Sequence, residues 1–183
     1  MRDYIISVWS WMDPLYYHFT RLTFPAKEGN IFRVRLTKYK GRNFVLSDGT
    51  EINKNDLLLK IHLHNIRLLK EFKSLTSELK KAKLIYNYVQ RSMPEIDLYI
   101  QNHPKSNKIK GVIGITILNK GCERLGFEVF DLSHPVYRWF KQIAFLPIGI
   151  LSSRNVSVSH ILKNHKPSYL FMSTKKLSNM YRK

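Results

Sequence analysis

The stretch Phe32-Arg-Val-Arg-Leu-Thr37 sets the first element of the fold. Its apolar residues alternate with arginine and threonine. Successive side chains of a β-strand point to opposite faces, so this pattern predicts a strand with one buried face. Residues 57–63, Leu-Leu-Leu-Lys-Ile-His-Leu, alternate in a similar way and predict another strand, with Lys60 and His62 on its polar face. Between these two strands, residues 44–46 are predicted to run back as a short extended segment, and Asp48-Gly49 predicts a turn.

A helix is predicted after the second of these strands, with Asn65 as its N-cap. Its apolar residues recur at spacings of three and four, which favours an amphipathic helix packed on the sheet and leaves a self-associating coiled coil as the alternative. They are Leu68, Phe72, Leu75, Leu79, Ala82, Tyr86 and Val89. Lys80, Lys81 and Lys83 are expected on its exposed surface. Pro94 is expected to open a second, short helix that runs to about Gln101.

The remaining segments complete an α+β pattern. Residues 111–125 could form a strand, because they are rich in β-branched side chains, but we favour a helix that Gly126 would end. We further expect strands at 127–130 and 169–172, helices at 4–19 and 135–146, a mobile segment at 151–166 and a C-terminal helix capped by Thr174. The sequence thus predicts one domain, residues 1–183, with a small, mostly antiparallel sheet covered by several helices. An aromatic-rich helical segment, 1–24, would precede the α+β body, 31–183.

The charge of the chain is strongly positive: 31 lysines and arginines face 13 acidic residues, a formal net charge of +18. Such a surface attracts polyanions, including nucleic acid, anionic lipid and acidic polymers. The aromatic fraction of 13% is too high for a disordered chain. We find no signal peptide. No stretch approaches the roughly 20 apolar residues that span a bilayer. We therefore expect a cytoplasmic protein, with peripheral attachment to a membrane left open.

Catalytic motifs are not recognisable in the chain. It has no phosphate-binding glycine loop and no G-x-S-x-G nucleophile motif. Cys122 is the only cysteine, and a position in an apolar turn beside Glu123 would raise its pKa. His62 and His64 could bind zinc if a third ligand arrived, but nothing selects that ligand from His103, His134, Glu123 or Asp131. We expect no catalytic residue, no cofactor and no metal.

Basic residues offer a candidate binding face. Arg33, Arg35 and Lys60 would form a patch around His62 if their two strands pair. Further basic clusters occur at Lys105, Lys108 and Lys110, and at Lys163, His165 and Lys166. Basic residues interleaved with aromatic ones suit an anionic membrane interface or single-stranded nucleic acid. A basic surface that only contacts solvent is the simplest alternative.

Three motifs of the chain form a recognisable set. They are Phe32-Arg-Val-Arg-Leu36 with Tyr39-Lys-Gly41, then Asp48-Gly-Thr50 with Ile61-His-Leu-His-Asn65, and finally Gly114-Ile-Thr-Ile-Leu118 with Glu123-Arg-Leu-Gly-Phe-Glu-Val129. Together they resemble the YkoP-like domain family. The resemblance covers nearly the whole chain. It implies a small bacterial domain of unknown function, found free-standing and behind polysaccharide deacetylase domains. His62 and Asn65 match the family motif, whereas His64 stands where an acidic or aromatic residue is more usual.

The resemblance implies an accessory role near envelope or spore polysaccharide rather than catalysis. We therefore expect a non-catalytic basic protein of the bacterial envelope or sporulation machinery that binds an anionic polymer or an anionic membrane surface. Its expected binding residues are Arg33, Arg35, Lys60, His62, Asn65, Glu123 and Arg124. A nucleic-acid-binding module is one alternative. An enzyme with a polar pocket around His62, Asn65 and Glu123 is the other.

Overall fold

The computed structural model describes residues 30–63, 65–72, 75, 77–116, 121–131 and 167–182. Its first half contains β1 (Phe32–Lys38), β2 (Phe44–Val45), β3 (Glu51–Ile52), β4 (Leu57–Leu63), α2 (Asn65–Phe72) and α3 (Glu78–Gln101). Its second half contains the 3-10 turn η1 (Ser106–Lys108), β5 (Ile109–Thr116), the 3-10 turn η2 (Cys122–Leu125), β6 (Glu128–Asp131), β7 (Ser168–Ser173) and α6 (Thr174–Tyr181). The helices predicted at 4–19 and 135–146 and the segment 151–166 lie outside the described residues, as does His64.

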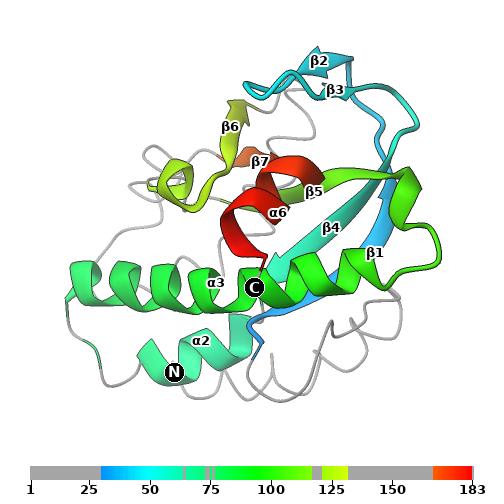
Figure 1. Cartoon of the computed structure of the whole chain (residues 1–183). Helices are drawn as coiled ribbons and strands as arrows, with labels where there is room; N and C mark the ends of the chain where they lie inside the picture. The colour runs from blue at the N-terminus through cyan, green and yellow to red at the C-terminus, as the bar shows by residue number, and fades with distance from the viewer. Residues whose placement is uncertain are drawn as a thin grey trace.

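The central sheet has five strands in the order β1-β4-β5-β7-β6, and β2 and β3 form a separate hairpin (Figure 1). The α+β class is therefore confirmed. The sheet is mixed, because β4 and β5 run parallel whereas the other neighbouring strands are antiparallel. Two parallel neighbours need a long crossover connection, and α2 and α3 supply it.

The two strands predicted from alternating apolar and polar residues are confirmed as β1 and β4. Their apolar residues meet across the ladder, with Phe32 opposite Leu63 and Val34 opposite Ile61. The prediction for residues 111–125 was wrong: β5 occupies the first part of this range, and η2 forms a short turn at its end. The β-branched side chains Val112, Ile113 and Ile115 favour the strand, where they pack on both faces of the sheet.

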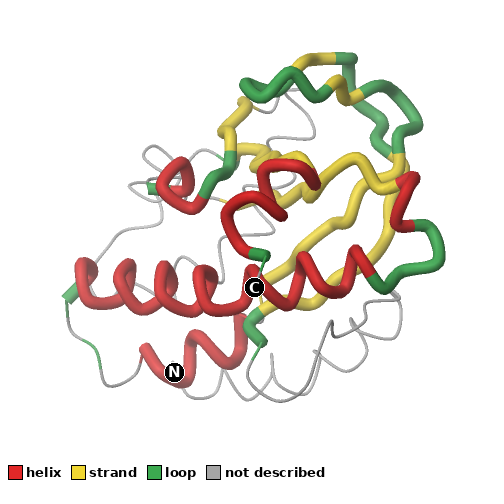
Figure 2. Tube along the Cα trace, viewed as in Figure 1, coloured by secondary structure: helices red, strands yellow, loops and turns green. Residues whose placement is uncertain are grey.

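Helices α3 and α6 lie over one face of the sheet, and α2 lies beside α3 (Figures 1 and 2). The expected single helix is two helices, because the chain leaves α2 at Phe72 and re-enters a helix only at Glu78. The break shifts the buried face, so Leu79 is 79% exposed while Lys81 is buried. Pro94 lies inside α3 rather than at the start of a new helix. Ser173, not Thr174, caps α6 by accepting a hydrogen bond from the backbone N–H of Lys176 at 2.9 Å.

The two faces of the sheet carry separate apolar cores. The larger core joins the sheet to the helices and includes Val34, Leu59, Met93, Ile96 and Leu177. The smaller core lies on the opposite face under the β2–β3 hairpin and includes Leu46, Ile52, Leu58, Ile113 and Phe171. No described helix is both long and apolar enough to cross a membrane.

Candidate functional site

Strands β1 and β4 pair, so the polar residues predicted on the two strands lie side by side. Arg33 lies opposite His62, and Arg35 lies opposite Lys60. However, Arg33 is only 7% exposed, and the other three side chains are half-buried. An arginine so enclosed cannot act as an open contact for a large polyanion. The two strands therefore pair as the expected patch requires, but Arg33, one of its residues, is enclosed.

The other three predicted residues lie elsewhere. Asn65 is the first residue of α2, directly beyond the strand that carries His62. Glu123 and Arg124 are exposed on η2, which packs beside β6 at the far edge of the sheet. Two strands, β5 and β7, separate β4 from β6, a distance of about 14 Å across three strand spacings. The structure therefore does not bring Glu123 to His62.

A different set of cations gathers at one end of the sheet. β1 ends there, β4 and β5 begin there, and β7 ends there before it leads into α6. The loops that join these strand ends to the next described elements all belong to the described residues. We call its nine cations the basic rim: Lys38, Lys40, Arg42, Lys54, Lys105, Lys108, Lys110, Lys175 and Lys176. All of them except the half-buried Lys176 are exposed.

Acidic residues at the same end are fewer, and three of them, Asp48, Asp56 and Glu128, accept internal hydrogen bonds. Among the described residues they are Asp48, Glu51, Asp56 and Glu128. Lys176 pairs with Glu128 at 3.7 Å, and the ammonium group of Lys40 donates to the side chain of Asn55 at 3.4 Å. Within the described residues, the ammonium groups of Lys105, Lys108 and Lys110 make neither an ion pair nor a hydrogen bond. The rim therefore keeps a clear surplus of accessible positive charge.

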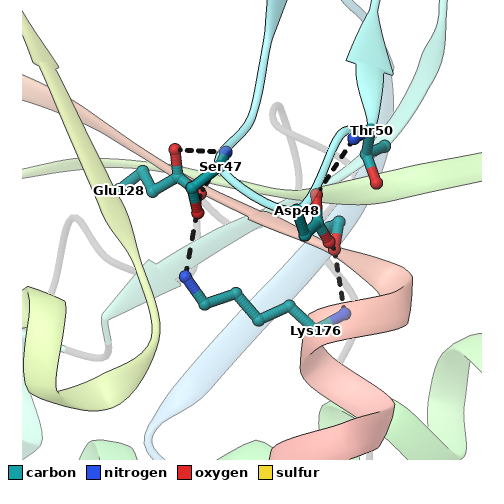
Figure 3. A network of polar contacts seen from close by, with 6 residues as sticks. Ser47, Asp48, Thr50, Glu128 and Lys176 are labelled. Carbon is teal, nitrogen blue, oxygen red and sulfur yellow. Dashed lines mark hydrogen bonds and ion pairs between the residues drawn. The ribbon is translucent and has the colours of Figure 1, made fainter.

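A polar network fixes the tip of the hairpin between β2 and β3 beneath the rim (Figure 3). The backbone N–H of Ser47 donates to both carboxylate oxygens of Glu128 at 3.0 Å, and its hydroxyl donates to one of them at 2.6 Å. Asp48 accepts from the backbone N–H of Thr50 at 3.0 Å and from the hydroxyl of Ser173. The network thus joins the hairpin to β6 and to the start of α6.

The same network determines the protonation of Asp48. Burial alone would raise the pKa of this carboxyl, but the hydrogen bonds from Ser173 and Thr50 and the charge of Lys175 outweigh it. The pKa of Asp48 therefore lies below its ordinary value of 3.8, and the group is ionised at neutral pH. This carboxylate contacts Ser173, the N-cap of α6, and so places a negative charge beside that helix end.

Neither an activated thiol nor a group of metal ligands occurs among the described residues. Burial, with a smaller contribution from the charge of Glu123, raises the pKa of Cys122 to about 11, so its thiol stays protonated. This agrees with the direction expected from the sequence. No three histidine, cysteine, aspartate or glutamate side chains in the described part of the chain lie close enough to hold a metal ion. The feature of the described residues that suits binding is the positive charge of the basic rim.

Comparison with known proteins gives the family. The model of the YkoP domain matches residues 2–181. The chain belongs to the YkoP domain family. It is 50% identical over 184 residues to the uncharacterized protein YkoP of Bacillus subtilis (strain 168), a match that covers 100% of this chain and 99% of that protein. No solved structure matches the chain. The family resemblance seen in the sequence motifs is thus confirmed.

None of the nine rim cations was among the binding residues expected from the sequence. Lys105, Lys108 and Lys110 stood out as a cluster in the sequence, but the others are scattered between residues 38 and 176. Each of them lies in a loop or at the end of an element. Only the strand order, with its parallel pair β4–β5, shows that these loops share one end of the sheet.

Proposed function

We propose that this member of the YkoP domain family is a non-catalytic accessory protein that binds an anionic polymer or an anionic membrane surface. The observation that carries the proposal is the basic rim, where nine cations face four acidic residues at a single end of the sheet. A cluster of one sign attracts a polyanion and raises the rate of association. The net charge of +18 over the whole chain strengthens the same attraction.

The cellular part of this proposal has a different basis. A role in the bacterial envelope or in sporulation follows from the family resemblance, which implies the company of polysaccharide deacetylase domains. A cytoplasmic location, in contact with the membrane surface, is also part of the proposal. The relative in Bacillus subtilis supports a bacterial protein, but its name says nothing about an envelope or sporulation role.

The catalytic alternative has weaker support from the geometry. It needs a pocket that joins His62, Asn65 and Glu123, and the strand order separates Glu123 from His62. The nucleic-acid alternative shares the electrostatic basis of the main proposal, because any phosphate backbone is attracted to the rim. We therefore treat nucleic-acid binding as one outcome of the test.

The test measures binding of the full chain to five probes at low and high salt. The probes are an anionic wall-type polymer, vesicles rich in anionic lipid, vesicles of neutral lipid, and single- and double-stranded DNA. The proposal expects salt-sensitive binding to the polymer or to the anionic vesicles, and none to the neutral vesicles. Absence of salt-sensitive binding to both would overturn it, and tighter binding to DNA would favour the nucleic-acid module.

A further inference from the structure

One part of the basic rim is suited to a defined ligand. The segment from Asn102 to Lys110, which we call the lysine loop, connects α3 to β5 and carries Lys105, Lys108 and Lys110 on its exposed surface. No acidic residue occurs between Leu98 and Cys122 in the sequence. The lysine loop therefore has positive charge without local compensation.

The backbone of the lysine loop is held in place by its own hydrogen bonds. The N–H of Ser106 donates to the carbonyl of His103 at 2.8 Å, and the N–H of Lys108 donates to the carbonyl of Lys105 at 2.9 Å. The imidazole Nδ1 of His103 accepts from the N–H of Lys105 at 3.0 Å. A backbone that is already ordered loses less entropy when a ligand binds.

Helix α6 begins beside the lysine loop and adds a further cation. The hydroxyl of Thr174 donates to the carbonyl of Lys110 at 3.4 Å, and Ser173 lies opposite Gly111 in the sheet. Lys175, the next residue of α6, is exposed. Four lysines from two segments far apart in the sequence thus occupy one side of the rim.

The kind of cation favours phosphate over carboxylate. Arginine recognises planar carboxylates with a fixed pair of hydrogen bonds, whereas a lysine ammonium is a compact point charge that suits the rounded surface of a tetrahedral phosphate. The lysine loop and the first turn of α6 contain lysines and no arginine. Repeated phosphates along a flexible chain would match such a row of separate charges.

The surroundings of these lysines argue against bases and against a bilayer. Every aromatic side chain among the described residues is buried or half-buried, so the described part of this end has no exposed ring on which a base could stack. Tyr39, the aromatic residue nearest the rim in sequence, packs against Phe44 and Phe171. Val45 is the one large apolar side chain exposed on the described loops of this end, which is too little for insertion into lipid.

We propose that the lysine loop, together with Lys175, binds a polyol-phosphate polymer, that is, a phosphodiester chain without stacking bases. This inference rests on the proposed polyanion-binding function and names the ligand of the same rim. Exposed amides beside the lysines, at Asn102 and Asn107, supply hydrogen bonds for the hydroxyl groups of the polyol.

The experiment compares three full-length proteins by fluorescence anisotropy. They are the unchanged chain, the variant Lys105→Gln/Lys108→Gln/Lys110→Gln and the control Lys80→Gln/Lys83→Gln/Arg91→Gln. Both variants lose three charges, but the control changes exposed positions of α3 outside the rim. Each is titrated into labelled poly(glycerol phosphate), polyglutamate and oligo-dT of equal charge at several salt concentrations. Circular dichroism checks that all three proteins are folded.

The lysine-loop variant should bind poly(glycerol phosphate) about 100-fold more weakly at 0.1 M salt, because each lost phosphate contact lowers the salt slope by about 0.7. The control should lose far less affinity. Equal losses in both variants would overturn the assignment of the lysine loop while leaving polyanion binding intact. Equal or tighter binding of polyglutamate or oligo-dT by the unchanged chain would overturn the choice of polymer. If the unchanged chain bound none of the three probes and no anionic vesicles, the proposed function itself would fail.

Discussion

Asp48 accepts a hydrogen bond from the hydroxyl of Ser173, a residue 125 positions further along the chain. The same hydroxyl accepts the backbone N–H of Lys176 and so caps α6. One side chain therefore connects the β2–β3 hairpin to the start of the C-terminal helix. This contact positions two of the segments that carry the basic rim, and its strength depends on the charge of Asp48.

Replacement of Asp48 by asparagine should lower the free energy of unfolding at pH 7 by about 1–2 kcal/mol, since a charged acceptor is lost. The pKa of Asp48 is lowered in the folded state, so its contribution is present above the ordinary value of 3.8 and is lost as the pH falls through the folded value. Urea unfolding between pH 2.5 and 7 measures this. The exposed Glu51→Gln change on the same hairpin is the control. A destabilisation by Asp48→Asn that stays constant over that pH range would contradict the account.

Gly111 marks a close approach between β5 and β7. A Cβ atom at this position would lie 2.5 Å from the carbonyl oxygen of Met172, whereas a Cβ on Gly114 would meet Ile61 at an ordinary 3.5 Å. We expect Gly111→Ala to destabilise the protein by about 1–3 kcal/mol, as overpacking does, and Gly114→Ala to change stability much less. Thermal unfolding of the two variants compares them directly. Equal melting temperatures for both would show that the two strands are not so closely spaced.

Cys122 should react slowly with alkylating reagents. Its pKa rises from 9.0 to about 11, which lowers the reactive thiolate fraction at pH 8 by about 100-fold relative to an unshifted thiol. Mass spectrometry after timed exposure to iodoacetamide gives the rate, and the protein unfolded in urea gives the reference rate. Equal rates in the folded and unfolded protein would refute the burial of this thiol.

Asn30 joins the start of β1 to α3. Its amide donates to Glu95 at 2.6 Å, and its oxygen accepts from the backbone N–H of Phe32 at 2.7 Å. Because the residue is buried, Asn30→Ala should cost about 2–3 kcal/mol of stability. It should leave polymer affinity unchanged while the variant is folded, since the rim is at the other end of β1. A loss of affinity in the folded variant would place the binding surface elsewhere.

Local patterns predicted the parts of the fold that depend on nearest neighbours. The alternation of Phe32, Val34 and Leu36 predicted the correct strand, and the same reasoning placed Arg33 and His62 on the polar faces of two strands that do pair. The prediction from local patterns was wrong at Gly111–Thr116, because the apolar residues there continue toward Cys122 at spacings of three and four, as in a helix. The β-branched residues favour a strand, and so does the close approach of Gly111 to Met172. That approach is a tertiary contact, which the local sequence does not show.

The candidate site was harder to predict because charge clusters depend on topology. Nothing near Arg33 in sequence shows that its side chain is enclosed in the folded protein. Likewise, Lys40 and Lys175 are 135 positions apart, and only the antiparallel and parallel pairings of the sheet bring their loops to one end. The composition of the chain indicated a polyanionic partner. Where the contact surface lies could be seen only in the structure.

Acetylation footprinting of lysines tests the central claim most directly, because it reports which ammonium groups the polymer covers. The full chain is acetylated briefly with and without poly(glycerol phosphate), and each lysine is quantified by mass spectrometry. The account predicts protection of Lys105, Lys108, Lys110 and Lys175, and little change at Lys80 and Lys83 on α3. Protection spread evenly over all six, or confined to the two on α3, would contradict the claim that the basic rim is the binding surface.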